Sequence, residues 1–427
     1  MADESVDAIV TDPPYGLEFM GKEWDSFRID ATPVESRAFQ NWCYLWATEA
    51  LRVLKPGGHL LAFGGTRTYH RLACAVEDAG FDVRDTIEWI YGSGFPKSLD
   101  VSKAIDKRAG PNYERTDREP PVTDDAKAWD GWGTALKPAH EPIVVARKPL
   151  AGSVADTVVA YGTGALNIDA TRVAGQRHGY PNGVQGNTFG GTPRRGRDEP
   201  EEGHPAGRWP PNVVLSHDDE CAITGRDAEG CVEGCPVRLI AEQRGHTSSP
   251  ASRPRSSDPP AVATWSLGRE GGVQVGHDYT GTAARFFPQF SDDDEEGSFR
   301  YVPKAKTAQR SAGIPVAVPV AAGPGGWSER PEGSAARNPH PTVKPVALMR
   351  WLVRLVAPPD GVVLDPFLGS GTTAVAAIAE ERRWIGIERD PEYAAVAAAR
   401  VAAAERAMRT RNLQARVDAA RALPSDP

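Results

Sequence analysis

Long apolar runs are absent from this sequence of 427 residues. No stretch approaches the roughly 18 apolar residues that a membrane-spanning helix requires, so we expect no membrane segment. Residues Met1 to Ser5 contain neither a basic region nor an apolar run, so we expect no signal peptide. Cysteine is scarce, at 5 residues, which argues against a disulfide-built secreted domain and favours a reducing compartment. We therefore expect a cytoplasmic protein.

Lysine is also scarce. Of the 49 basic residues 11 are Lys, which leaves 38 Arg, and no Lys lies between Lys148 and Lys304. Arginine suits bidentate recognition of phosphates and bases, although genome base composition explains the same bias. The net charge of −8 excludes a surface coated in positive charge but allows a local basic groove. Arg194-Arg195-Gly196-Arg197 and Arg253-Pro254-Arg255 suit phosphate contacts, or solubility alone.

The texture of the chain divides it into regions. Residues 1–150 and 299–410 alternate short apolar runs with helical spacing, which predicts an α/β domain with a parallel sheet and helices on both faces. Residues 151–298 are rich in Gly, Pro, Ser and Arg and show poor periodicity, which predicts a loop-rich insertion. The polar residues 411–427 predict a flexible tail.

The periodicity also predicts individual elements. The expected strands are Val6–Val10, His59–Phe63, Phe81–Tyr91, Glu141–Ala146, Gly361–Leu364 and Trp384–Ile387. The expected helices are Ala38–Leu54, Tyr69–Ala79, Val346–Val356, Thr372–Glu381 and Pro391–Met408. Cys43 and Cys74 fall in two of these helices and are expected in the core.

Asp12, Pro13, Pro14 and Tyr15 directly follow the first expected strand. The carboxyl end of a strand is where α/β enzymes place ligands. The two prolines restrict the backbone and remove two N–H donors, so they aim local carbonyls and the Asp12 carboxylate at one point. A carboxylate and a carbonyl together accept two hydrogen bonds from an amine, and Tyr15 offers a face to a planar base. A plain surface turn is the other interpretation.

A second motif, from Val362 to Thr373, predicts a buried strand, a glycine-rich loop and the start of a helix. Gly369 and Gly371 allow close approach to the backbone, and the helix presents N–H groups. The loop lacks the patterns of a P-loop and of dinucleotide sites. The next strand leads to Glu388, an acidic residue that suits ribose hydroxyls. A bland glycine turn remains the alternative.

Together these motifs, DPPY and DPFLGSGTT, resemble those of the S-adenosylmethionine-dependent DNA amino-methyltransferases, which modify adenine N6 or cytosine N4. Their order is similar to that of the β group, in which a target-recognition region lies between them. Leu54–Gly58, Trp89–Ser98 and Asn338–Pro345 are similar to further family segments in the same order. The resemblance covers roughly residues 6–150 and 299–400.

The resemblance implies a Rossmann-like methyltransferase fold with residues 151–298 as the target-recognition region. Asp12 and the Pro13 carbonyl, aimed with Pro14, would hold the target amine of a flipped-out base, and Tyr15 would stack on that base. The implied partner is double-stranded DNA, and no covalent enzyme intermediate is expected. The residues implied to bind S-adenosylmethionine are Lys344, Asp365, Phe367, Gly369, Ser370, Gly371, Thr372, Thr373 and Glu388.

Several alternatives stay open. Asp at the first position of DPPY favours adenine N6, with cytosine N4 as the alternative target. A catalytically silent nucleic-acid-binding subunit is disfavoured by the intact motifs, and a protein-amide or RNA methyltransferase by Asp12 and the long insertion. A homodimer and a cognate restriction enzyme are both compatible with the resemblance. Asp12 lies closer to the start than in most family members, as a trimmed or misassigned N-terminus would produce.

His217, Cys221, Cys231 and Cys235 form a cluster within nineteen residues of the insertion. Three Cys and one His are a ligand set for a tetrahedral structural zinc, which would stabilise a segment with little apolar content. Their spacing matches no standard zinc finger, and His246 is another candidate for the fourth ligand. Ordinary buried thiols are the other interpretation.

Overall fold

The computed structural model describes most of the two ends of the chain and parts of its middle. The described residues are 1–17, 25, 35–91, 98–110, 115–116, 119–173, 207–217, 221, 230–233, 235–244, 247–248, 253–254, 273–274, 280–281, 287, 289–290, 311–312, 338, 340 and 342–422.

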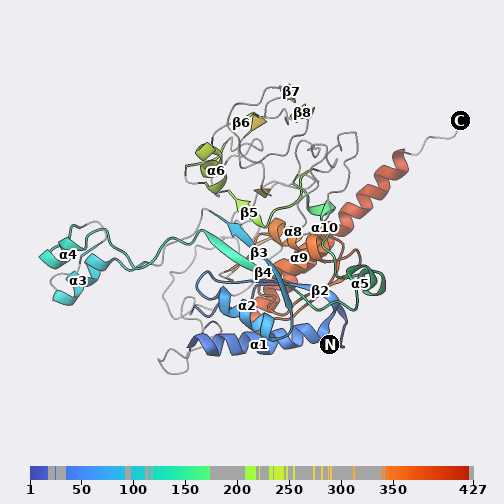
Figure 1. The fold of residues 1–427 in the computed structure, drawn as a ribbon, viewed down its shortest axis with the longest axis horizontal. Helices are drawn as coiled ribbons and strands as arrows, with labels where there is room; N and C mark the ends of the chain where they lie inside the picture. Colours follow the sequence, from blue (N-terminus) through green and yellow to red (C-terminus); the bar gives the residue numbers. More distant parts are fainter. Residues whose placement is uncertain are drawn as a thin grey trace, which may run out of the picture.

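One mixed sheet of eight strands forms the centre of the described protein (Figure 1). Its strand order is β10-β5-β3-β4-β2-β1-β11-β12. All neighbouring strands run parallel except β4, which is antiparallel to both β2 and β3. The strands are β1 (Val6–Thr11), β2 (Leu54–Phe63), β3 (Asp82–Ile90), β4 (His140–Arg147), β5 (Val213–Ser216), β10 (Gln289–Phe290), β11 (Val362–Asp365) and β12 (Arg383–Gly386).

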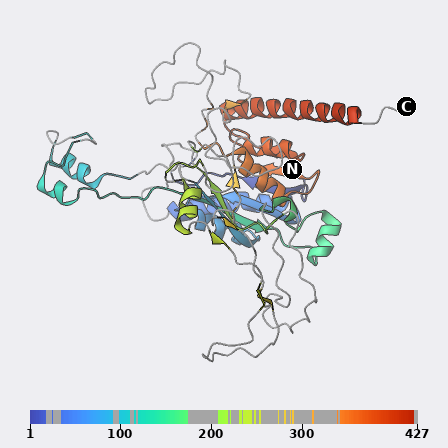
Figure 2. The ribbon, with the colours of Figure 1, turned by 90° about the horizontal axis from the view of Figure 1, so that it is seen from above.

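The antiparallel strand β4 corrects the prediction of a parallel sheet. A parallel neighbour of β3 would need a crossover that packs across the sheet. Instead, the connection from β3 carries α3 (Val101–Ala109) and α4 (Asp124–Ala128) on an arm that projects from the body (Figures 1 and 2). The chain then returns along the same edge, so β4 enters between β2 and β3 in the opposite direction.

Helices cover both faces of the sheet, which confirms the expected doubly wound, Rossmann-like architecture. One face packs against α8 (Val346–Val356) and α9 (Thr372–Ala379), and the other against α1 (Glu35–Val53) and α2 (Tyr69–Asp78). Alternate residues of each strand enter the two cores because successive strand side chains point to opposite faces. In β1, Ala8 and Val10 therefore belong to the first core and Ile9 to the second.

Three local predictions need correction. Cys43 is buried, but Cys74 is exposed, because α2 buries Leu72, Ala75 and Val76 and carries Cys74 on its outer side. Strand β2 begins at Leu54, five residues before the predicted start at His59, because residues 55–58 form an irregularity within the strand, with Gly57 at φ +76°.

The last helix, α10 (Pro391–Ala422), extends fourteen residues past Met408, where we predicted its end (Figure 2). Residues 409–422 therefore continue the helix in place of a frayed tail. The reason is local: these residues are mostly Ala, Arg, Leu and Gln, which favour helices, and Pro424 is the first proline after them.

Parts of the predicted insertion belong to the sheet. The helix α5 (Val154–Tyr161) packs on β2, and the Asn167 N–H donates to the Leu355 carbonyl at 2.8 Å. Strand β5 pairs with β3, so Val214 lies beside Trp89. Beyond it, the described helices and strands of the insertion that lie outside the central sheet are α6 (Pro236–Arg244) and the two-residue strands β6 (Thr247–Ser248), β7 (Arg253–Pro254), β8 (Val273–Gln274) and β9 (Thr280–Gly281).

Within the described part of the chain, no helix combines the length and apolar character needed to cross a membrane.

Candidate active site

The two sequence motifs meet at the centre of the sheet. Strands β1 and β11 are parallel neighbours, with Ile9 beside Leu364, so both motifs follow carboxyl ends at the same edge. The sheet changes direction between these strands, because β2 lies outward from β1 and β12 outward from β11. Ligands of doubly wound proteins bind at such a switch point. The Thr11 hydroxyl donates to Asp365 Oδ1 at 2.7 Å and joins the two motifs directly.

The DPPY turn is held in place by its neighbours. Tyr15 leads into Gly16, whose φ of +67° is a conformation that favours glycine. The Thr68 hydroxyl donates to the Tyr15 carbonyl at 2.6 Å. The carboxylate of Asp25 accepts the Gly16 and Leu17 N–H groups at 2.7 and 3.1 Å. These bonds constrain the backbone that places Asp12 and Tyr15.

Asp12 belongs to a cluster of polar side chains. Lys344 Nζ donates to Asp12 Oδ2 at 2.6 Å, and the Tyr15 hydroxyl lies 2.8 Å from Asp12 Oδ1. Glu141, at the start of β4, lies 3.0 Å from that hydroxyl and 3.3 Å from Lys344 Nζ. Tyr91, directly after β3, donates to the other oxygen of Glu141 at 3.2 Å. Residues from both ends of the chain thus build one buried cluster.

The charges of this cluster do not cancel. Two carboxylates face one ammonium, so the group carries one net negative charge when all three are ionised. Burial raises the pKa of Asp12 above its usual range, and the nearby Lys344 opposes that rise. Burial tends to lower the pKa of Lys344, but Asp12 and Glu141 outweigh this effect and the pKa is raised. Burial and the two carboxylates raise the pKa of Tyr15, so its hydroxyl stays protonated. Such a site attracts hydrogen-bond donors.

The cluster also presents apolar surface. Lys344 Nζ lies 4.9 Å from the centroid of the Phe63 ring and 5.4 Å from that of Tyr15. Tyr15 is half-buried and packs against the core on the α8 side of the sheet. A planar group with an amine edge suits this combination of a ring and a carboxylate.

The glycine-rich loop joins β11 to α9. Gly369 and Gly371 have φ values of +54° and +83°, which favour glycine. A Cβ at Gly369 would lie 2.8 Å from His340 Nε2, and one at Gly371 would lie 3.0 Å from Ala397 Cβ. The Gly369 N–H donates to Glu388 Oε2 at 2.7 Å, which places the carboxylate after β12 at the loop.

The polar side chains of the loop point into the protein. Thr373 donates to Asp365 Oδ2, and burial raises the pKa of Asp365 to about 6 despite the hydrogen bonds from Thr11 and Thr373. The buried guanidinium of Arg400 donates to the Ser370 carbonyl at 2.6 Å, to its hydroxyl at 2.9 Å and to the Thr372 hydroxyl at 3.0 Å. The loop therefore offers its backbone, more than these side chains, to a ligand.

Two predicted cofactor residues have other neighbours. Phe367 packs against Trp42 and Trp46 of α1, at ring-centroid distances of 5.4 and 5.6 Å. Lys344 lies with Asp12 and Glu141. Its predicted role in cofactor binding stays a prediction.

Three residues at the site are not predicted from the sequence. The sequence assigns Glu141 only to a strand. Because β4 is antiparallel, its first residues lie at the edge of the sheet where the parallel strands end. An acidic residue at the start of an apolar strand indicates a site residue only when that direction is known. Arg400 is an arginine in an Ala-rich helix, and sequence alone does not show that it is buried. Tyr91 is predicted only as the end of a strand. Each acts through a partner distant in the sequence.

Comparisons with known proteins agree with these features. The DNA methylase family N6_N4_Mtase matches residues 6–195 and 286–399. The type II methyltransferase M.HindIII of Haemophilus influenzae is 25% identical over 196 residues, which are 38% of this chain and 59% of that protein. The methylase YubD of Escherichia coli K12 is 48% identical over 69 residues, 16% of this chain and 30% of that protein.

This chain therefore spans less than two thirds of either curated relative. Among solved structures, the PvuII DNA methyltransferase (cytosine-N4-specific) is 14% identical, with a TM-score of 0.40 over 94% of this chain and 80% of that one. The family match includes both the DPPY turn and the glycine loop and covers more than half of the chain. The protein is a member of the N6_N4_Mtase family of DNA methylases.

Proposed function

We propose that this protein transfers the methyl group of S-adenosylmethionine to an exocyclic amine of a base flipped out of double-stranded DNA, with adenine N6 as the target. One observation carries the proposal: DPPY and the glycine loop end neighbouring parallel strands and are joined by the bond from Thr11 to Asp365. An amine held by the first motif would lie beside a ligand held by the second.

The glycine loop fits the cofactor by its chemistry. The two carboxylate oxygens of Glu388 accept hydrogen bonds from the N–H groups of Gly369 and Asp390, at 2.7 and 2.8 Å. Each oxygen has a second lone pair that can accept a hydrogen bond from a ribose hydroxyl. Gly369 and Gly371 take positive φ values, and this conformation shapes the loop backbone that would face a nucleoside. When bound, S-adenosylmethionine would supply an electrophilic sulfonium methyl group.

The residues of this chain would orient the amine. Asp12 and the Pro13 carbonyl would accept its two hydrogens and direct the nitrogen lone pair toward the cofactor side. Conjugation makes such a nitrogen a weak nucleophile, so positioning and preorganised charge are the main contributions of the protein. Asp12 is also the acceptor for the proton that the methylated nitrogen releases, and its raised pKa suits that step.

Adenine N6 is preferred because Asp, rather than Ser, begins the motif. The proposed target-recognition region is residues 151–298, of which α5 packs on the sheet and β5 and β10 pair within it. The arginines at 194, 195, 197, 253 and 255 are its proposed phosphate contacts.

Expression in a host that lacks DNA methylation tests the proposal. Modification-sensitive sequencing of the host DNA should show N6-methyladenine at one recurring sequence, and DNA from cells expressing Asp12→Ala should show none. N4-methylcytosine at a recurring sequence would keep the reaction but change the target. Unmodified DNA in a strain that accumulates folded protein would instead support the catalytically silent subunit.

A further inference from the structure

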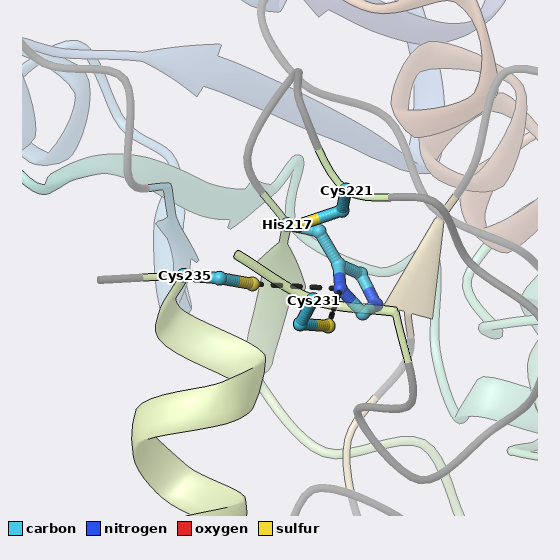
Figure 3. Close-up of side chains that lie close together, drawn as sticks. All are labelled: His217, Cys221, Cys231 and Cys235. Carbon is cyan, nitrogen blue, oxygen red and sulfur yellow. Dashed lines mark hydrogen bonds between the residues drawn. The ribbon is translucent and has the colours of Figure 1, made fainter. Parts of the chain in front are cut away.

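The insertion contains a second cluster, distant in role from DPPY and the glycine loop. His217 directly follows β5, and Cys235 directly precedes α6. Together with Cys221 and Cys231, their side chains converge on one point (Figure 3). The ligand atoms of all four residues lie within 4.8 Å of one another.

The distances within the cluster suit a shared metal ion. His217 Nδ1 lies 2.8 Å from Cys231 Sγ and 3.4 Å from Cys235 Sγ (Figure 3). In a tetrahedral zinc site, bonds of about 2.3 Å to sulfur and about 2.0 Å to nitrogen place the ligand atoms roughly 3.5–3.8 Å apart. The four atoms therefore need only small adjustments to surround one ion.

The surroundings also resemble a structural site more than an active one. His217 and Cys235 are buried, and Cys221 and Cys231 are half-buried. The Val232 N–H donates to Cys221 Sγ at 3.4 Å, which stabilises negative charge on that sulfur. Four protein ligands complete a tetrahedron and leave no position for a substrate, as in closed structural zinc sites.

Among the residues that the structure describes, the apolar core around the cluster has four buried members, Leu215, Cys235, Val237 and Ala241. A metal that ties these chain segments together would add its binding free energy to the stability of this core. Buried thiols alone explain the presence of sulfur. They do not explain why three sulfurs and one imidazole nitrogen lie within 4.8 Å of one another.

We propose that His217, Cys221, Cys231 and Cys235 bind one zinc ion that anchors the insertion to the catalytic sheet. Soft thiolates with one imidazole select zinc among the common divalent metals of similar coordination. The anchor is direct: His217 extends β5, which pairs with β3, and the Trp89 indole donates to the Ser216 hydroxyl at 2.7 Å. The same strand β3 leads to Tyr91, whose hydroxyl donates to Glu141 in the polar cluster around Asp12.

Metal content is the first test. Protein purified without chelators or a metal-affinity tag should contain about one zinc per chain by elemental analysis. Cys221→Ser and Cys235→Ser should lose the metal, whereas Cys74→Ser, which changes the exposed cysteine on α2, should keep it. Protein that contains no zinc, and whose metal-free form binds neither Zn²⁺ nor Co²⁺, would overturn the proposal.

Alkylation of the native protein gives a second readout that does not depend on a variant that folds. Cys74 should react rapidly with a thiol reagent, while Cys221 and Cys231, although half-buried, should react only after chelation. Equal rates with and without a chelator, or a disulfide among these cysteines in freshly purified protein, would contradict a zinc site.

Cobalt replacement identifies the ligands. Co²⁺ added to the metal-free protein should produce a thiolate-to-cobalt charge-transfer band and the intense visible absorption of tetrahedral cobalt. The band should weaken in Cys231→Ser and persist in Cys74→Ser. Visible absorption without a thiolate band would exclude this ligand set. None of these readouts requires DNA binding or methyl transfer, so their failure is distinguishable from failure of the proposed function.

Discussion

The carboxylate of Asp12 accepts a 2.6 Å hydrogen bond from the ammonium of Lys344, although 332 positions separate the two residues. This pair sets the charge on the carboxylate that would hold the target amine. Burial favours the neutral acid, and the ammonium favours the carboxylate.

Replacement of Lys344 by Met should shift the pH dependence of methyl transfer. Without the ammonium the pKa of Asp12 rises further, so the ionised form is lost at a higher pH. The acid limb of the kcat–pH profile should move to higher pH. A pKa of Asp12 that is higher by one unit lowers kcat on that limb about tenfold. A pH–rate profile checks this, with Lys127→Met, on exposed α4, as the control. Weaker cofactor binding with an unmoved profile would support the cofactor role instead.

Asp12→Ala should separate binding from chemistry. We expect kcat to fall by about a hundredfold or more, as for loss of other preorganised polar groups, while the cofactor Kd stays near the wild-type value. Asp12→Asn keeps the shape but loses the charge and should also be much slower. Calorimetry with cofactor and single-turnover kinetics measure the two effects. A folded Asp12→Ala protein that loses both would contradict the assignment.

Arg400→Met should weaken cofactor binding, although Arg400 itself would support the glycine loop and not touch the cofactor. Its three hydrogen bonds support Ser370 and Thr372 from behind. Loss of about 1.4 kcal/mol of loop preorganisation would raise the cofactor Kd about tenfold. Arg400→Lys keeps the charge but not the three-way geometry and should be intermediate. Arg406→Met, exposed on the same helix, is the control, and equal affinities in all four proteins would disprove this role.

Asp365→Asn should change how stability depends on pH. The pKa of Asp365 in the folded protein is about 6, above its ordinary value of 3.8. Between these values the folded state binds more protons than the unfolded state, so this residue makes the free energy of unfolding fall as pH rises, by at most about 1.4 kcal/mol per pH unit. The Asn variant should lack this slope when unfolding is measured from pH 4 to 6 without cofactor.

His59 provides a comparison of opposite sign. Burial, with repulsion from Arg147 and Arg84, lowers the pKa of His59 to about 4 from 6.5. Its contribution to stability is present above pH 6.5 and is lost as pH falls through 4. The wild-type His59 therefore makes the free energy of unfolding rise with pH in this range, and His59→Asn should remove that rise. Identical pH profiles for the two variants and the wild type would show that neither group is coupled to folding.

The arginines proposed to contact phosphates should control salt dependence. Joint replacement of Arg194, Arg195 and Arg197 by Ala should lower DNA affinity. The slope of log K against log salt should become shallower by about one for each phosphate that loses its arginine. Cofactor affinity should stay unchanged. DNA binding of the wild type that is flat in salt would argue against phosphate contacts of any kind.

The parts of the fold that depend on local sequence are predictable. The DPPY turn and the glycine loop each follow a buried strand. Once these two strands are predicted to be parallel, both motifs are expected at the same edge of the sheet. Glu141 and Arg400 are not predicted, because their roles depend on partners that are not near in the sequence. Glu141 contacts Tyr15, 126 positions away, and Arg400 contacts Ser370, 30 positions away. The direction of β4 is not predicted either, since alternation of apolar runs does not report which way a strand runs.

Cys74 shows a smaller limit of the same kind. Apolar spacing assigns a residue to a helix more reliably than to one side of it, and Cys74 lies one position from the buried Ala75. His217, Cys221, Cys231 and Cys235 are grouped from sequence because they are close in the chain, and the structure brings all four together.

The position of β1 has a consequence for biosynthesis. Its neighbours are β2, which begins at Leu54, and β11, which begins only at Val362. A ribosome that has translated half of the message has therefore released a hydrophobic strand with one open edge, which can pair with other chains. Assembly of the central sheet must wait for the last quarter of the polypeptide, so truncation before β11 should yield aggregates rather than a smaller enzyme.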